Sequence, residues 1–449
     1  MADTAIRTKD QTPTIEGMAE GMAKPAGALD ARLAALNLPQ QGGFSARARQ
    51  DALGRLRAMG LPGPRDEYWR YTDPRGFNAP VPQALPIPHA DETPLFDGLD
   101  KLTLVFVDGA FDEAASDDLA LDGVEIATLA QADTVGSWAA DLYGVLESAG
   151  QTPVKRPFAA LNTAAARDGV LIRVTRTPSR PIHVVHRRGA TDADAMWHHV
   201  IRVEQGAELT LLETGMSGAR SNGVIEVDVA RGGKFHHVAS KRAVDPKVGI
   251  SHVFARIASQ AQFKSFTLSV NGTVMRNEAV IDIAGDDAVA HIAAAVLGDG
   301  EQAPFHHDDT VFITHGAERC ESRQVFKKVL KNGATGVFQG KILVKPGAQK
   351  TDGYQISQAL LLDERSQFLA KPELEIYADD VKCSHGSTTG AIDDEALFYL
   401  RSRGVPRERA IVFLVLSFLA DALAEVEDEG LRDRIYERLD VWLTLNAVH

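Results

Sequence analysis

A repeat of 26 to 28 residues in the middle of the chain constrains the fold more than any other feature of the sequence. Over residues 170–389, short runs of β-forming residues alternate with Gly, Asn, Asp and Pro turns. An apolar residue is followed six positions later by a second one, and this pattern begins at Val203, Val229, Ile257 and Ile283, with weaker copies at Ile313 and Val344. Such a period is typical of stacked coils, because a single coil cannot bury its own apolar face. We therefore predict a β-solenoid core over residues 166–390, and a β-sandwich with evenly spaced hairpins is the alternative.

The segments on either side of this core have a different composition. Residues 1–95 combine helical spacing of apolar residues with a proline-rich stretch, and they are predicted to form a helical region followed by a linker. Residues 96–165 are predicted to form a mixed α/β transition, and residues 391–449 a C-terminal helical region. Residues 408–427 are apolar on almost every side, so this helix must be covered, either by its own domain or by another chain.

Charge and composition argue against several classes of function. The chain has 449 residues and a formal net charge of −13, so it lacks the basic surface expected of a protein that binds nucleic acid or anionic lipid. Its longest apolar stretch, residues 410–420, is far shorter than the ~20 residues that cross a bilayer, and its first residues contain no apolar signal segment. The two cysteines, Cys320 and Cys383, cannot form a four-cysteine metal site. We expect a soluble, cytoplasmic protein that contacts neither nucleic acid nor membrane.

Motifs of common nucleotide-binding and hydrolytic enzymes do not occur in the sequence. Residues 336–342 come nearest to a phosphate-binding loop, but one residue is missing between the glycines, and Ile342 stands where Ser or Thr would bind magnesium. Neighbouring residues on a strand point to opposite faces, so a histidine doublet on a strand is a poor metal site. This applies to three doublets in the sequence, His198-His199, His236-His237 and His306-His307.

Cys383 and His385 form the best candidate site. On an extended strand, residues two apart face the same way, so a thiol would lie beside an imidazole, and both groups are metal ligands. Two ligands do not complete a tetrahedral site, so the others would have to come through the fold or from a second chain. The alternative is a buried, inert thiol and a hydrogen-bonded histidine.

Eight short motifs are spread along the chain, at residues 67–72, 158–163, 180–183, 320–324, 336–340, 349–352, 375–386 and 393–404. Together they resemble the SufB/SufD family, the scaffold subunits of the SUF iron–sulfur cluster assembly machinery. The resemblance extends from about residue 60 to about residue 420. Within the family, the segment from Lys382 to Gly386 is similar to the SufD branch, and two cysteines leave little room for the sulfur-relay cysteines of the SufB branch.

The resemblance implies a right-handed parallel β-helix flanked by helical N- and C-terminal regions, acting as a scaffold without enzymatic activity. It also implies pairing with a SufB chain through the β-helix edge. His385, with Cys383 beside it, would hold iron or a nascent cluster at that interface. The ATPase SufC would dock on the C-terminal helices, through Leu397, Phe398, Leu400, Phe413 and Leu416. We expect no cofactor held tightly by the chain alone; iron or an iron–sulfur cluster would bind transiently in the complex with SufB, and reduced flavin is a further candidate ligand of that complex.

Two other functions stay open at this point. A β-helix enzyme, such as a carbohydrate-active protein, would place paired carboxylates in a surface groove. Strand geometry would split the adjacent pairs of this sequence across two faces, which concerns Asp286-Asp287, Asp308-Asp309 and Asp379-Asp380. A stand-alone homodimer, in which two copies pair at their free β-helix edges, is the other alternative.

Overall fold

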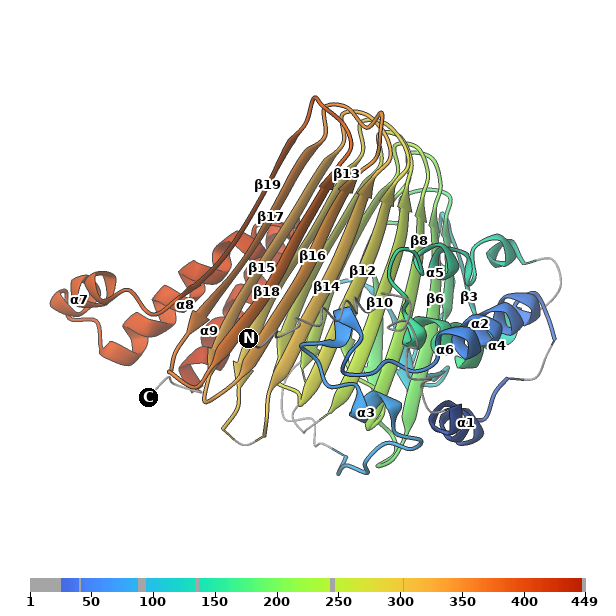
Figure 1. Cartoon of the computed structure of the whole chain (residues 1–449), viewed down its shortest axis with the longest axis horizontal. Helices are drawn as coiled ribbons and strands as arrows, with labels where there is room; N and C mark the ends of the chain where they lie inside the picture. The colour runs from blue at the N-terminus through green and yellow to red at the C-terminus, as the bar shows by residue number, and fades with distance from the viewer. Residues whose placement is uncertain are drawn as a thin grey trace, which may run out of the picture.

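The computed structural model describes residues 26–39, 42–87, 94–133, 137–242, 247–301 and 303–445. Within them the chain is mainly β, with two long sheets in the middle and helices at both ends (Figure 1). Residues 1–25, 40–41 and 88–93 of the predicted N-terminal region lie outside the described residues, as do residues 446–449 of the C-terminal region. No helix in the described part of the chain is long and apolar enough to cross a membrane.

The strands form two sheets that face each other along the molecule. Sheet A contains, in chain order, β1 (Leu102–Val107), β2 (Ala110–Phe111), β5 (Ile182–Arg187), β7 (Glu208–Gly215), β9 (Lys234–Arg242), β11 (Gln262–Val270), β13 (Val289–Asp299), β15 (Glu321–Lys331), β17 (Asp352–Leu361) and β19 (Lys382–Gly390). Sheet B contains β3 (Val124–Thr128), β4 (Val170–Val174), β6 (Asp194–Val203), β8 (Arg220–Val229), β10 (Val248–Ile257), β12 (Val274–Ile283), β14 (His306–His315), β16 (Thr335–Val344) and β18 (Gln367–Ile376). From β4 onward the chain alternates between the sheets, and each strand pairs in parallel with the strand two places later. The predicted β-solenoid is confirmed, and the sandwich alternative is wrong, because hairpins would make neighbouring strands antiparallel.

The sequence repeat corresponds to the strand register. Val203, Val229, Ile257 and Ile283 pair with one another at the ends of β6, β8, β10 and β12. The weaker copy at Ile313 is misplaced, because the residue paired with Ile283 is His315. The repeat pattern has an apolar residue at this position, whereas this corner holds a buried imidazole, hydrogen-bonded through Nε2 to the Ser322 hydroxyl at 2.8 Å. The copy at Val344 is correctly aligned, since it pairs with His315.

The corners that lead from sheet B to sheet A between β6 and β17 each contain a residue in the left-handed region. Gly206 and Gly232 occupy this position first, with φ of 70° and 66°. Later coils use residues with side chains at φ between 56° and 61°, namely Gln260, Asp287, Arg319 and Lys350. The backbone N–H at this position donates to a carbonyl of the next coil, as from Gly206 to Arg231 at 3.1 Å. The stacked corners therefore continue the hydrogen-bonding of the sheets outside the strands.

Helices cover the outer faces of both sheets. On sheet B these are the N-terminal elements α1 (Ala26–Ala34), α2 (Ala46–Met59), η1 (Glu67–Trp69), α3 (Arg75–Asn78), α4 (Leu129–Ala132), η2 (Trp138–Asp141), α5 (Val145–Ala149) and α6 (Pro157–Ala165). On sheet A they are α8 (Arg407–Leu423) and α9 (Glu429–Leu445), preceded by α7 (Asp394–Ser402). Ile411, Val415 and Leu419 of α8 are buried against sheet A and α9. The chain itself therefore covers most of the apolar helix predicted at residues 408–427.

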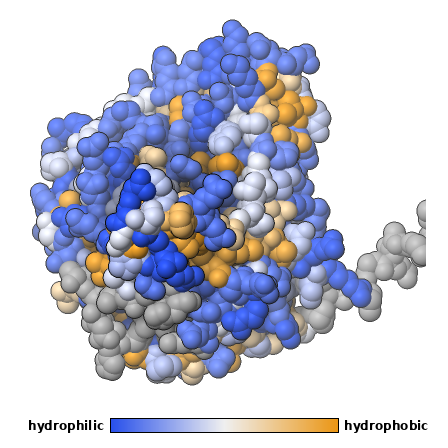
Figure 2. Space-filling model, turned by 90° about the vertical axis from the view of Figure 1, so that its left-hand side faces the viewer, coloured by the Kyte–Doolittle hydropathy of each residue, from blue (hydrophilic) through white to orange (hydrophobic). Residues whose placement is uncertain are grey.

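The two ends of the solenoid differ. At the N-terminal end, β2 and β3 pair antiparallel with β1 and β4 and close the first coil. At the other end, and within the described residues, β18 pairs only with β16 and β19 only with β17, so both present an edge. Figure 2 looks onto this side of the molecule, where apolar residues gather in the middle of the face among hydrophilic ones. We call this the open end.

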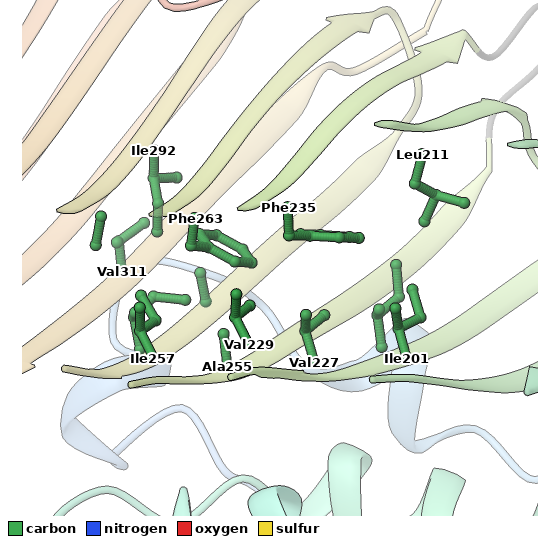
Figure 3. Packing of buried hydrophobic residues seen from close by; sticks show 14 of the residues in the cluster. Ile201, Leu211, Val227, Val229, Phe235, Ala255, Ile257, Phe263, Ile292 and Val311 are labelled. Carbon is green, nitrogen blue, oxygen red and sulfur yellow. The ribbon is translucent and has the colours of Figure 1, made fainter. Parts of the chain in front are cut away.

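Much of the interior, the space between sheets A and B, is filled by a ladder of apolar side chains. Figure 3 shows residues of this cluster stacking coil on coil along the solenoid. The rings of Phe235 and Phe263, paired residues of β9 and β11, stack with centroids 5.5 Å apart. Fully burying such a side chain contributes roughly 1.5–3 kcal/mol, so the interior column stabilises every coil through its neighbours.

Candidate functional site

Cys383 and His385 both lie on β19, the edge strand of sheet A. In the register, His385 pairs with Gln355, and Gln355 pairs with Gln324. The two glutamines are completely buried and hydrogen-bonded, from Gln355 Nε2 to Gln324 Oε1 at 2.8 Å. Residues paired across parallel strands share a face, so His385 continues the inward-facing column of the interior at its last step. His385 itself is exposed, because β19 has no further strand beside it in the described part of the chain.

Cys383 lies on the same face, two residues before His385, and is half-buried. It packs with the apolar cluster of the last coil, which includes Ile342 and Val344. Burial raises the pKa of the Cys383 thiol, so this group is protonated at neutral pH in the chain alone. These surroundings favour a packed, protonated thiol over a reactive thiolate.

The described residues do not complete a metal site around His385. No group of three His, Cys, Asp or Glu side chains within them is arranged to hold a metal ion. The prediction that Cys383 and His385 share a strand face agrees with the register. In the described part of the chain, no third His, Cys, Asp or Glu side chain joins them in a group that could hold a metal ion. Any metal bound by His385 would need its other ligands from a second molecule.

The residues predicted to bind an ATPase divide into exposed and covered ones. Phe398 on α7 is 73% exposed and Phe413 on α8 is 40% exposed. Leu397 and Leu416 are half-buried and pack against the chain's own apolar cluster between sheet A and the C-terminal helices, and Leu400 is also half-buried. A charge at Leu416 would therefore disturb this chain as well as any partner contact.

Sequence reasoning missed Tyr399 on α7, which is 56% exposed beside Phe398, with the guanidinium carbon of Arg403 3.4 Å from its ring centroid. Helix α7 begins at Asp394, directly after the cap residue Asp393, whose Oδ1 accepts the N–H of Ala396 at 2.9 Å. In Figure 1 this helix projects from the open end, next to the end of β19. Two exposed aromatic rings on one short projecting helix are typical of a protein contact.

The two histidines of each doublet lie on one strand and point to opposite faces of its sheet, as predicted from strand geometry. His307 points into the interior, where its Nδ1 lies 3.1 Å from Lys328 Nζ, while His306 points outward to the Thr72 hydroxyl at 2.9 Å. His199 and His237 likewise take interior positions. None of the doublets therefore presents two imidazoles to one point.

A further group of ionisable side chains lies in the interior, where sequence reasoning did not place it. The Glu213 carboxylate accepts hydrogen bonds from His186 Nε2 at 2.9 Å and His237 Nε2 at 3.2 Å. Burial by itself raises the pKa of Glu213, but the two imidazole hydrogen bonds outweigh it and hold this pKa well below its usual range. No sequence signal distinguishes Glu213 from the exposed glutamates of a half-buried strand.

The same interior network continues in later coils. Lys241 Nζ donates to Ser251 Oγ at 2.7 Å, and Lys328 Nζ to Asp309 Oδ2 at 2.6 Å. A cavity of about 40 Å³, which Glu213 and Lys241 help to line, is large enough for a few water molecules. These groups are paired with one another, so we assign them a structural role in the solenoid rather than a catalytic one.

Comparison with known proteins agrees with this geometry. Residues 186–418 match a family model described as "SUF system FeS cluster assembly, SufBD core domain". The chain is 31% identical to the iron–sulfur cluster assembly protein SufD of Escherichia coli over 406 residues, which cover 87% of this chain and 91% of that protein. It is 26% identical to an iron–sulfur cluster assembly SufBD family protein of Synechocystis over 86% of this chain and 88% of the relative. SufD of Bacillus subtilis is 31% identical over a shorter stretch, 35% of this chain and 36% of the relative. A parallel β-solenoid with a matching core domain and a nearly full-length relative together show that this chain belongs to the SufB/SufD family.

Proposed function

We propose that this chain is a non-enzymatic scaffold subunit of the SUF machinery for iron–sulfur cluster assembly. The open end of the solenoid carries the proposal. Among the described residues it presents two edge strands that are paired on one side only, and it carries Cys383 and His385 on the face that continues the interior. An edge of this kind is suited to strand addition by a second solenoid, which would extend both sheets across the interface. The partner we assign to it is a SufB chain, and the other ligands of the transient cluster would come from that chain.

The C-terminal helices supply a second docking surface in this proposal. Phe398 and Tyr399 on α7 are assigned to the ATPase SufC, which would provide the nucleotide chemistry that no motif of this sequence supports. Only three residues, Ala391, Ile392 and Asp393, separate β19 from α7. A force applied to α7 during an ATPase cycle would therefore act directly on the strand that holds His385.

The carbohydrate-active alternative is disfavoured by what the paired carboxylates contact. Asp308 forms an ion pair with Arg276, and Asp309 forms one with Lys328. Asp287 lies at a corner, where its Oδ1 accepts from Arg319 Nε at 2.7 Å. These carboxylates are engaged in holding coils together, whereas glycoside hydrolysis needs two that face a common substrate groove. The homodimer alternative uses the same open end and becomes an outcome of the test.

The test is co-purification from the native host with a tagged full-length chain. We expect a SufB chain and an ABC-type ATPase to be recovered together with it. Phe398→Asp should lose the ATPase and keep SufB, because its ring is exposed and the substitution leaves the chain's own core intact. Tyr377→Asp, at an exposed residue directly after β18, should lose SufB and keep the ATPase. Recovery of the chain only as a homodimer, or retention of both partners by both variants, would contradict the proposal.

A further inference from the structure

Residues 67–72 are one of the motifs that resemble the family, and the proposed function gives them no role. They lie on the outer face of sheet B, where Figure 1 shows the segment between α2 and α3 passing in front of the strands. The Tyr68 carbonyl accepts hydrogen bonds from Arg276 Nη1 at 3.0 Å and from Gln339 Nε2 at 3.2 Å. The Thr72 hydroxyl donates to Asp308 Oδ2 at 2.6 Å. The motif is thus bonded to β12, β14 and β16, three consecutive strands of sheet B.

The motif also reaches β18, the edge strand of the open end. The Tyr68 phenol donates to Glu373 Oε2 at 2.6 Å, and Lys371 Nζ lies 2.6 Å from Glu67 Oε1. The same ammonium group lies 4.1 Å from the centroid of the Tyr68 ring and 3.2 Å from Glu373 Oε1. We call these four side chains, Glu67, Tyr68, Lys371 and Glu373, the β18 latch. Burial and the neighbouring Glu373 carboxylate raise the pKa of Tyr68 far above its usual value, so the phenol remains a donor at every physiological pH.

The latch matters more for β18 than the other contacts do for their strands. β12, β14 and β16 have a hydrogen-bonded strand on each side. Within the described residues β18 pairs only with β16, from Thr335↔Gln367 to Val344↔Ile376. Two flanking backbone bonds continue this pairing, from Gln367 N to Ala334 O and from Tyr377 N to Val344 O, each at 2.9 Å. A strand held along one edge opens at a lower free-energy cost than an internal strand. Side-chain contacts from outside the sheet therefore make a larger relative difference at β18.

We propose that Glu67 and Tyr68 hold the edge strand β18 against β16 and so position the terminal coil for strand addition by a partner. The first half stands on the chain alone; the second rests on the proposed function, which assigns the open end to a SufB chain. Tyr68 and Glu67 are positioning residues in this proposal, because their contacts reach β18 and not His385. A merely local role would tie down the N-terminal segment and leave the dynamics of β18 unchanged.

Hydrogen–deuterium exchange on the full-length chain tests the first half. In Tyr68→Phe we expect amides of residues 367–377 to exchange about fivefold faster, the effect of losing one hydrogen bond to a charged, partly exposed acceptor. Amides of residues 306–315 in β14 should keep their rate. Tyr71→Phe is the matched control, since the Tyr71 hydroxyl has no hydrogen bond among the described residues. Unchanged exchange at β18, or equal acceleration in β14 and β18, would overturn the latch.

A double variant shows whether Tyr68 acts through Glu373. Glu373→Ala should accelerate exchange at β18, and adding Tyr68→Phe should add little, because both substitutions remove the same contact. Fully additive effects would mean that Tyr68 does not hold β18 through this carboxylate, which would contradict the proposal.

Binding to a SufB chain from the same host tests the second half. Tyr68→Phe should weaken the affinity several-fold and Tyr71→Phe should not. Tyr377→Asp, which disrupts the edge directly, separates the two claims. If Tyr377→Asp binds normally, the open end is not the docking surface and the proposed function fails, while the exchange data still decide the latch. If Tyr377→Asp binds weakly and Tyr68→Phe binds normally, the positioning role is refuted.

Discussion

Replacing Lys328 with Met is expected to destabilise the solenoid strongly, because it leaves a buried carboxylate without its cation. The Lys328 side chain is completely buried in the interior. Its Nζ lies 2.6 Å from Asp309 Oδ2 and 3.1 Å from His307 Nδ1. Burial by itself raises the pKa of Asp309, but the Lys328 ammonium and His307 outweigh it and hold that pKa far below its usual value. Asp309 is therefore ionised in the folded chain and depends on this ammonium group.

The size of the effect follows from what Met keeps and what it removes. Met fills nearly the same volume as the Lys328 stem, so the cavity contribution is small. Breaking a buried ion pair by removing one partner typically costs 3–5 kcal/mol. Asn277 Nδ2 still donates to Asp309 Oδ1 at 3.2 Å, which moderates the loss. We therefore expect a decrease of about 3 kcal/mol in the free energy of unfolding, at the lower end of that range.

Urea unfolding of the full-length chain, followed by far-UV circular dichroism, measures this decrease. Lys234→Met is the matched control, because Lys234 Nζ forms an equally short pair with Glu208 at 2.6 Å, but both side chains are about half exposed. That pair should contribute less than about 1 kcal/mol. Adding Asp309→Leu to Lys328→Met should recover part of the loss, since the orphaned charge is then removed. A Lys328→Met variant as stable as the control variant would refute the buried ion pair.

Two further predictions concern stability. Gly340→Ala should lower the melting temperature by several degrees, because the added Cβ would lie 1.9 Å from Gln355 Nε2. Gly54→Ala, in α2, should be neutral or stabilising by up to about 1 kcal/mol, because the added Cβ would point into open space. Thermal unfolding of both variants by calorimetry compares the two. Protonation of Glu278 should contribute to unfolding in acid. Burial raises the pKa of Glu278, but the neighbouring cations, Arg276 above all, outweigh burial and lower this pKa to about 2. The ionised carboxylate therefore stabilises the fold fully above about pH 4.5, and this contribution is lost as the pH falls toward 2. A Glu278→Gln variant should therefore lose the difference in stability between pH 5 and pH 2 that this carboxylate gives the wild type.

The periodicity of the sequence predicted the solenoid well, because the stacking of coils acts directly on the spacing of apolar residues. Val203, Val229, Ile257 and Ile283 fell into one register column without any structural information. The prediction weakened where the period changed, since Ile283 pairs with a residue 32 positions later. A polar corner residue such as His315 has no apolar pattern by which it could be found.

The docking residues could not be sorted from sequence, because apolar periodicity does not say which molecule covers a face. Leu416 and Phe413 lie on the same apolar helix, yet Leu416 packs against this chain's own cluster and Phe413 is substantially exposed. The interior charges were missed for a related reason. Both faces of each sheet are covered over much of their length, so alternation along a strand does not show that Glu213 and Lys328 point into the solenoid.

Iron content of the assembled complex tests the central claim, that His385 at the open end is a ligand for the transient cluster. The complex containing His385→Ala should form normally by size-exclusion chromatography, because this exposed imidazole makes no hydrogen bond within the described residues. We expect its iron per intact complex to fall clearly below wild type, since Ala offers no donor. Cys383→Ser should have a milder effect, because the Cys383 thiol is packed and protonated. Unchanged iron loading in a fully assembled His385→Ala complex would contradict the ligand role of His385.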